Sequence, residues 1–202
     1  MNTNKTVDFK IIILGSLGVG KTSLLNRYIN NRFIQEYRTT LGASILTKEI
    51  EVDNMLVKLQ IWDTGGQERF KSLVPFFSKG ADGCVLAFDV TDKDSFYALE
   101  GWREEILEKI PLEYENYPFV VLGNKIDLTD RQVTSDEAEA WCTARNIPYF
   151  EVSAKQGINV DHAFENITRN ALSQSYSLRV GLYLVKLPPW SIRAQAGEQH
   201  FL

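Results

Sequence analysis

The residues best suited to chemistry lie in a glycine-rich segment near the N-terminus, at positions 15–22. They read Gly-Ser-Leu-Gly-Val-Gly-Lys-Thr, a complete G-x-x-x-x-G-K-T pattern between an expected strand and an expected helix. Glycines let the backbone curl so that its N–H groups face phosphate oxygens, and the following helix adds its positive end. The alternative, a chance glycine-rich turn, is disfavoured by the flanking strand and helix. The predicted phosphate-binding residues are Gly15, Ser16, Leu17, Gly18, Val19, Gly20, Lys21, Thr22 and Ser23.

Within this segment, Lys21 and Thr22 carry the side chains that polyphosphate chemistry requires. The Lys21 ammonium supplies positive charge toward the β- and γ-phosphates and is a catalytic candidate, and the Thr22 hydroxyl is suited to ligate Mg²⁺. This motif by itself leaves the base undecided among the purine nucleotides.

A second group of candidates lies in Trp-Asp-Thr-Gly-Gly-Gln, residues 62–67, at the end of an expected strand. Asp63 stands where a doubly wound sheet presents its ligand-contacting residues, and it would reach Mg²⁺ through a water molecule. A bond from the Gly66 N–H would form with a triphosphate and vanish with a diphosphate, and Gln67 is placed to orient the attacking water. Thr40, in the long connection after the first helix, either reaches the metal and the γ-phosphate or is an ordinary loop hydroxyl. The predicted metal-binding residues are Thr22, Thr40 and Asp63.

A third group follows two later strands and is predicted to select the base. It comprises Asn-Lys-Ile-Asp at 124–127 and Ser-Ala-Lys at 153–155. Asp127 can accept two hydrogen bonds, from the guanine N1–H and the exocyclic amine, a donor pair that adenine lacks. Because the wrong base would leave this carboxylate unpaired, we predict specificity for guanine, and hence GTP and GDP as ligands.

The other residues of the predicted base site surround Asp127. Asn124 braces the loop, the Lys125 stem covers one face of the base, and the Ala154 N–H meets guanine O6. Phe33 either covers the other face or is a core aromatic after the first helix. The remaining assigned nucleotide contacts are Ser153, Lys155, Ile34 and Tyr37.

These groups need a scaffold, and the apolar patterns predict buried strands alternating with helices. Strands are expected at 10–14, 44–52, 55–62, 83–90, 119–123 and 149–152, and helices at 21–30, 94–110, 135–145 and 160–173. Asp53 and Asn54 predict a tight turn between two antiparallel strands, and Thr134 with Glu137 predicts a capping box. The predicted fold class is α/β, a doubly wound six-stranded, mostly parallel sheet with one antiparallel strand.

Composition and charge limit the other classes of function. A net charge of -4 over 202 residues argues against a nucleic-acid surface, and no apolar stretch is long enough to span a membrane. Cys84 and Cys142 are too few for a disulfide framework or a zinc site, so we expect two buried thiols in a reducing, cytoplasmic setting. The composition turns basic after residue 173. We therefore predict one nucleotide-binding domain at 1–173 and a variable, poorly ordered tail at 174–202.

Together these motifs resemble those of the Rab family of small GTPases over residues 7–173, and most of all its late-endosomal Rab seven subgroup with its b-type branch. Lys-Leu-Gln-Ile-Trp-Asp at 58–63, Arg-Phe-Lys-Ser-Leu at 69–73 and Phe-Asp-Val-Thr at 88–91 are typical of Rabs. Thr-Leu-Gly-Ala-Ser-Ile at 40–45 is typical of the subgroup. The family's P-loop G domain is the fold that this resemblance implies.

The resemblance also implies a function in vesicular and endosomal membrane traffic. Such a switch binds and hydrolyses GTP and recruits effectors when GTP-bound. It is served by an exchange factor, a GTPase-activating protein and a GDP-dissociation inhibitor or escort protein. The implied location is the cytosolic face of late endosomes, lysosomes or Golgi-derived membranes. The implied effector surface is Ile45, Trp62 and Phe77, and ordinary sheet packing is the alternative for Ile45.

Three features depart from the Rab pattern. Leu17 stands where most Rabs carry a small residue and Gly65 replaces the usual alanine, and both predict slow intrinsic hydrolysis. No cysteine lies near Leu202 to receive a prenyl group, so a mainly cytosolic protein without stable membrane anchoring is expected. An alternative function is therefore a GTP-binding interaction module with little turnover.

Overall fold

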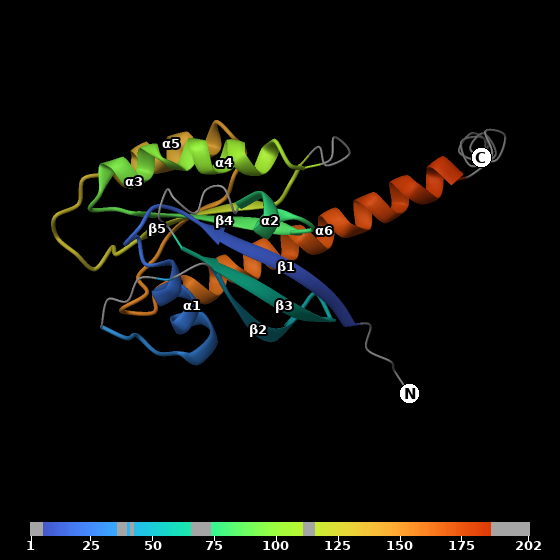
Figure 1. Ribbon diagram of the computed structural model, residues 1–202, viewed down its shortest axis with the longest axis horizontal. Helices are drawn as coiled ribbons and strands as arrows, with labels where there is room; N and C mark the ends of the chain where they lie inside the picture. The colour runs from blue at the N-terminus through green and yellow to red at the C-terminus, as the bar shows by residue number, and fades with distance from the viewer. Residues whose placement is uncertain (1–5, 36–39, 41–42, 66–73, 111–115, 187–202) are drawn as a thin grey trace, which may run out of the picture.

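A six-stranded sheet forms the centre of the molecule, with helices on both faces (Figure 1). The computed structural model describes residues 6–35, 40, 43–65, 74–110 and 116–186, with side chains up to residue 178. The strand order is β2-β3-β1-β4-β5-β6, and among these strands only β2 runs antiparallel to its neighbour. The predicted fold class is thus confirmed. The strands are β1 (Thr6–Leu14), β2 (Ala43–Val52), β3 (Met55–Thr64), β4 (Gly83–Asp89), β5 (Phe119–Asn124) and β6 (Tyr149–Glu151).

The sheet separates two layers of core, each covered by helices. The helices are α1 (Lys21–Asn30), α2 (Val74–Ser78), α3 (Lys93–Tyr97), α4 (Leu99–Leu107), α5 (Ser135–Thr143) and α6 (Val160–Lys186). Ile11 and Ile13 of β1 pack with α1 and α6, whereas Ile12 and Leu14 pack with the layer of α3, α4 and α5 on the other face (Figure 1). Every residue of β4 is buried, as expected for a central parallel strand covered on both faces.

Two local predictions, a hairpin turn and a helix cap, can be compared with the structure. Asp53 and Asn54 have φ angles of 51° and 60°, the left-handed pair that a tight hairpin turn requires, so the turn is confirmed. The Thr134 hydroxyl accepts a hydrogen bond from the Glu137 N–H at 3.1 Å, which confirms the N-cap. The Glu137 carboxylate instead lies 3.4 Å from Lys93 Nζ, so an ion pair to α3 takes the place of the second half of the capping box.

Several boundaries differ from the predicted ones. The single helix predicted at 94–110 is two helices, α3 and α4, but Ala98 between them keeps helical dihedral angles and donates to Asp94 O at 3.0 Å. The interruption is therefore one residue wide. β1 begins at Thr6, earlier than predicted, because its polar first residues already pair with β3 from Leu56 onward.

Two helices, α2 and α6, also differ from expectation. α2 was not predicted, since five residues are too few to show a helical period. α6 continues past the predicted end at residue 173 to Lys186, although the next residues, 174–177, are mostly polar. In this stretch the hydroxyls of Ser175 and Ser177 donate to the carbonyls of Leu172 and Ser173, so local hydrogen bonding satisfies side chains that have no core to face.

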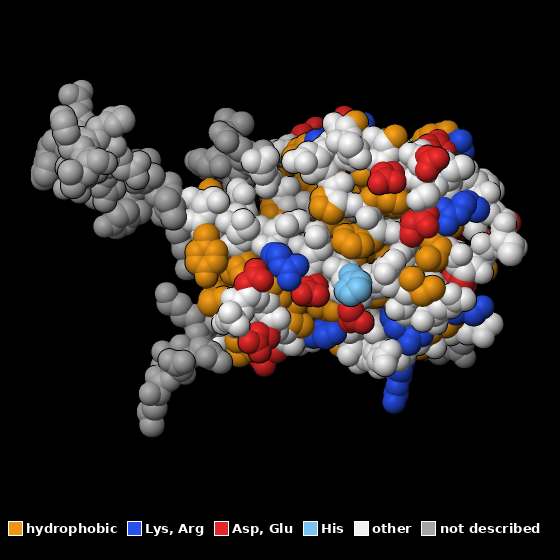
Figure 2. All heavy atoms as spheres, turned by 180° about the vertical axis from the view of Figure 1, so that it is seen from behind, with side chains coloured by type: hydrophobic (Ala, Val, Ile, Leu, Met, Phe, Trp, Pro, Cys, Tyr) orange, Lys and Arg blue, Asp and Glu red, His pale blue; other side chains and the backbone are white. Residues whose placement is uncertain are grey.

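The prediction of two buried thiols is confirmed. Cys84 and Cys142 are free and buried, and burial raises the pKa of both thiols, that of Cys142 to about 12. In the face shown in Figure 2, acidic and basic side chains are interspersed. Among the described helices, none is both long and apolar enough to cross a membrane.

Replacing Gly123 by alanine is expected to lower the free energy of unfolding by about 1–3 kcal/mol. A Cβ at this position of β5 would lie 2.6 Å from the Tyr149 hydroxyl and 2.9 Å from Phe88 Cζ, and the Phe88 ring is fully buried. Gly101, in α4, has nothing within 4 Å of an added Cβ, so Gly101→Ala serves as the control and should add up to about 1 kcal/mol. Urea denaturation of both variants measures the difference, and equal stabilities would contradict it.

Candidate nucleotide-binding site

The glycine-rich segment forms the turn from β1 into α1, and two of its glycines allow close backbone approaches. Gly15 has φ 148°, and a Cβ there would lie 2.1 Å from the Ala87 carbonyl oxygen of β4. Gly20 has φ 95°, and its Cβ would lie 2.4 Å from Asn124 Nδ2 at the end of β5. Both positions therefore require glycine. Because Gly20 supplies no side-chain cap, the N–H groups of the first turn of α1 are suited to an anion.

The Lys21 side chain folds back over this loop. Its Nζ donates to the carbonyl oxygens of Gly15 at 2.8 Å and Ser16 at 3.0 Å, and the side chain is buried. Burial lowers the pKa of Lys21 to about 8, although the nearby Asp63 carboxylate acts in the opposite direction. The ammonium thus lies beside the backbone groups that would hold a polyphosphate, as the sequence predicts.

The three predicted metal-binding residues meet at one point. The Thr22 hydroxyl donates to Asp63 Oδ2 at 2.6 Å, and the hydroxyl oxygens of Thr22 and Thr40 lie 2.9 Å apart. Asp63 is buried, and its Oδ1 has no hydrogen-bond partner among the described residues. Burial raises the pKa of Asp63 against the opposing effects of Thr22 and Lys21. An all-oxygen set with one buried, unpaired carboxylate oxygen fits a hard cation such as Mg²⁺.

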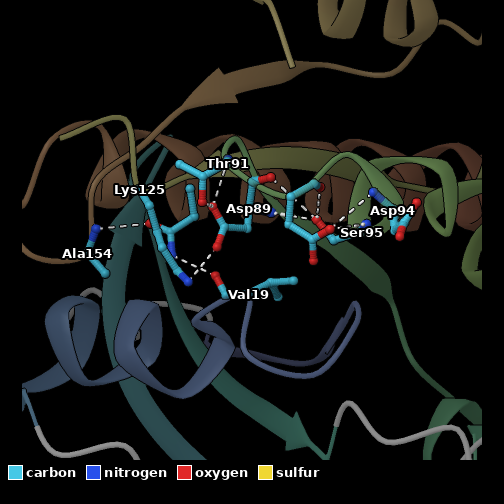
Figure 3. Close-up of polar contacts among 9 residues, drawn as sticks. Val19, Asp89, Thr91, Asp94, Ser95, Lys125 and Ala154 are labelled. Carbon is cyan, nitrogen blue, oxygen red and sulfur yellow. Dashed lines mark hydrogen bonds and ion pairs between the residues drawn. The ribbon is translucent and has the colours of Figure 1, made fainter. Parts of the chain in front are cut away.

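Asn124 connects the phosphate loop to the loop after β6. Its Nδ2 donates to the Val19 carbonyl oxygen at 2.8 Å, and its Oδ1 accepts from the Ala154 N–H at 3.1 Å. These contacts can be followed between Val19 and Ala154 in Figure 3. The predicted bracing role of Asn124 is thus visible, whereas the Ala154 N–H, predicted to meet guanine O6, has Asn124 as its partner here.

Lys125 is held by a carboxylate that the sequence analysis did not assign to the site. Lys125 Nζ lies 2.5 Å from Asp89 Oδ2, and Asp89 Oδ1 accepts from both the N–H and the hydroxyl of Thr91 (Figure 3). Lys125 also has a left-handed φ of 70°. The only sequence signal for Asp89 was its place in the Rab-like string at 88–91, at the carboxyl end of a buried strand.

Asp127 lies in a small pocket beside these residues. Its Oδ1 accepts from the Ser153 hydroxyl at 2.6 Å, and Lys155 Nζ lies 4.0 Å from its Oδ2. Phe33 is 37% exposed, so it lines the pocket instead of joining the core. The pocket has a volume of about 200 Å³, and its lining residues are Phe33, Gln35, Asn124, Lys125, Asp127, Leu128, Ala154 and Lys155.

The remaining residues predicted to contact the nucleotide do not all lie at the base pocket. Leu17, in the phosphate loop, is 43% exposed. Ile34 is exposed and lines a separate hollow with Asn26, Asn30 and Arg32, so the structure does not bring it into the base pocket. Predictions for Tyr37, Gly66 and Gln67 lie outside the described residues.

The three residues predicted as an effector surface are neighbours on and beside the β2–β3 hairpin. Ile45 faces Trp62 across the two strands and is 51% exposed, so it is not packed into the sheet. The Trp62 and Phe77 ring centroids are 6.0 Å apart, and Lys10 Nζ lies 4.1 Å above the Trp62 ring. Phe77 is only 9% exposed, whereas its neighbour Phe76 is 72% exposed. The exposed aromatic surface here thus includes Phe76, which the sequence analysis missed.

Comparison with known proteins adds independent information. Residues 10–173 match the model of the Ras family. The Ras-related protein Rab-7b of Bos taurus is 62% identical over 179 residues, which cover 88% of this chain and 89% of that protein. The human Rab-7b is 58% identical over 178 residues, with 88% and 89% covered. The GTP-binding protein YPTC5 of Chlamydomonas reinhardtii is 55% identical over 177 residues, with 85% and 86% covered.

The pKa of Lys21 predicts that GDP affinity falls as pH rises through about 8. Phosphate groups favour the charged ammonium, so binding above pH 8 must add a proton to Lys21, and this proton uptake weakens the affinity. Between pH 7 and 8.5, below the range where guanine N1 ionises, the Kd should rise about fourfold. Fluorescence titration of GDP measures it. Lys21→Arg, which stays charged, is the control, and a flat wild-type profile would contradict the expectation.

Proposed function

This chain belongs to the Rab proteins of the Ras family of small GTPases, and we propose that the convergent loops described above form its guanine-nucleotide switch. As a Rab GTPase it binds GTP and GDP, hydrolyses GTP and regulates vesicle traffic. The alternative of an interaction module with little turnover is not favoured by these relatives. The observation that carries the site assignment is the pair of Asn124 hydrogen bonds, because they join the phosphate side to the base side.

The hydroxyls of Thr22 and Thr40 and, through water, the Asp63 carboxylate are proposed to hold Mg²⁺. Their convergence and the unpaired Asp63 Oδ1 support this assignment. When bound, the ion would neutralise charge on the β- and γ-phosphate oxygens. Asp63 serves as the buried acceptor that fixes the Thr22 hydroxyl, and Lys21 adds the adjacent positive charge.

Base recognition is assigned to Asp127, which would accept from guanine N1–H and the exocyclic amine. The Ser153 hydroxyl holds one Asp127 oxygen at 2.6 Å, so the carboxylate is oriented before a base arrives. Lys125, fixed by Asp89, and Phe33 are proposed to cover the two faces of the base. This pre-orientation lowers the cost of ordering the Asp127 carboxylate when a base binds.

Hydrolysis is assigned to Gln67, which would orient the attacking water. The Gly66 N–H would donate a hydrogen bond to the γ-phosphate. Both residues are proposed from the sequence pattern, since they lie outside the described residues. Leu17 is exposed on the phosphate loop, where its branched side chain would crowd the incoming groups. We therefore expect slow intrinsic turnover that an activating protein raises.

Rab proteins generally work with an exchange factor, an activating protein, effectors and a GDP-dissociation inhibitor. We assign effector contact to the surface of Ile45, Trp62 and Phe77, extended by Phe76. Ile45 and Phe76 are exposed, and the Phe77 ring contacts those of Trp62 and Phe76. Late endosomal, lysosomal or Golgi-derived membranes are the proposed place of action, on the basis of similarity to Rab-7b.

Asp127→Asn is expected to raise the Kd for GDP at least about 100-fold and to improve binding of xanthosine diphosphate. The amide loses one charged acceptor toward guanine and offers a donor to the C2 carbonyl of xanthine. Competition binding against labelled GDP measures both effects. Asp130→Asn, the same change at a nearby exposed position, is the control. A GDP affinity of Asp127→Asn within twofold of wild type would overturn the base assignment.

Leu17→Ser should raise the single-turnover rate of GTP hydrolysis by roughly 3- to 10-fold, which corresponds to about 1 kcal/mol of activation free energy. The smaller side chain would leave room beside the γ-phosphate for the attacking water. Leu107→Ser removes a similarly exposed leucine from α4 and should leave the rate unchanged. An equal or lower rate for Leu17→Ser would show that Leu17 does not limit turnover.

A further inference from the structure

Arg27 lies in the last turn of α1, and its guanidinium contacts two separate backbone segments. Nε donates to the Ala154 carbonyl oxygen at 2.8 Å, and Nη2 donates to the Lys155 carbonyl oxygen at 2.7 Å. Nη1 donates to the carbonyl oxygen of Asn31 at 3.0 Å and to Asn31 Oδ1 at 3.1 Å. All of these acceptors are neutral oxygens, and a planar guanidinium can serve them together.

The two contacted segments lead to opposite sides of the base pocket. Ala154 and Lys155 line the pocket after β6, and the Ala154 N–H is the group held by Asn124. Asn31 ends α1 in a left-handed conformation with φ 50°, and Phe33 follows it on the other side of the pocket. The Arg27 guanidinium therefore ties one side of the pocket to the other from behind.

The neighbouring loop geometry supports this arrangement. An added Cβ on Gly157, in the same loop as Ala154, would lie 3.5 Å from Arg27 Cδ, so the loop packs along the arginine stem. Gln156 donates its N–H to the Ser153 hydroxyl, which in turn donates to Asp127. Moving the carbonyls of Ala154 and Lys155 would therefore also disturb the residues that orient Asp127.

We propose that Arg27 is a positioning residue that sets how long guanine nucleotide stays bound. The proposal rests on the assignment of the base pocket made above. For the base to leave, the Phe33 side and the Ala154 side must separate, and the hydrogen bonds of Arg27 oppose that separation. Hydrogen bonds from a charged donor are stronger than neutral ones, so their loss should be measurable as faster release.

The test is the dissociation rate of a fluorescent GDP analogue from wild-type protein and variants, with excess GDP and Mg²⁺. Arg27→Gln should release nucleotide about tenfold faster, because its amide cannot reach all three acceptor residues. Arg27→Lys should give an intermediate rate, since a single ammonium replaces the planar fork. Arg169→Gln is the matched control, because Arg169 pairs with Asp53 and Glu165 on the exposed side of α6.

A second readout separates positioning from a general loosening of α1. The same helix begins with Lys21 and Thr22, so a loosened helix would also slow single-turnover hydrolysis of GTP and weaken the apparent Mg²⁺ affinity. Positioning of the base loop predicts that both quantities remain within twofold of wild type while release accelerates. Faster release together with an equal loss of hydrolysis and Mg²⁺ affinity would overturn the proposal, as would unchanged release in both Arg27 variants.

The Asp127→Asn variant, measured beside these, distinguishes the two levels of inference. If it loses its preference for GDP while Arg27→Gln releases GDP at the wild-type rate, the pocket assignment stands and the role of Arg27 is wrong. If Asp127→Asn keeps its preference, the pocket assignment itself is wrong and the proposal for Arg27 falls with it.

Discussion

The Asn124 carboxamide is the contact on which the arrangement of the site depends. It is buried, and its two ends hold the Val19 carbonyl of the phosphate loop and the Ala154 N–H of the base loop. Its closeness also explains why position 20 is glycine, because any Cβ there would collide with Asn124 Nδ2. Three loops that are far apart in the sequence are thereby held in fixed positions relative to one another. If either partner were lost, the buried amide would be left with an unsatisfied group, which costs a substantial amount of folding free energy.

Helix α1 performs a related role from the other side of the loops. It begins with Lys21 and Thr22 at the phosphate side and reaches Arg27, Asn31 and then Phe33 at the base side. Ten helical residues span about 15 Å, so one rigid element sets the distance between the two halves of the site. Tyr28 anchors this helix, since its ring stacks on Phe164 of α6 at 4.3 Å. The helix that begins at the phosphate loop is thus anchored by packing on one face of the sheet.

Much of the fold was predictable because the signals are local. Uniformly apolar runs indicated the buried strands, and Asp53 with Asn54 indicated the hairpin. Short or polar elements were missed: α2 has too few residues for a period, and the polar start of β1 is held by backbone pairing to β3. The site motifs were found by type and spacing, but the contacts of Asp89 with Lys125 and of Arg27 with Ala154 join residues that are distant in the sequence. The exposure of Phe76 likewise depends on how α2 packs, which its own residue type does not indicate.

The amino-acid sequence alone predicted the class of chemistry, since the charge and hydrogen-bonding capacity of a G-x-x-x-x-G-K-T loop, Asp63 and Asp127 favour a guanine nucleotide as the ligand. Tertiary structure decided how those groups are held. It placed Phe33 in the pocket instead of the core, and it gave Lys125 a carboxylate partner and Arg27 its carbonyl partners. The physical reason is that residue types and their spacing indicate which groups can form hydrogen bonds or ion pairs. Which of these groups come close together depends on how the fold places the loops at the carboxyl ends of the parallel strands.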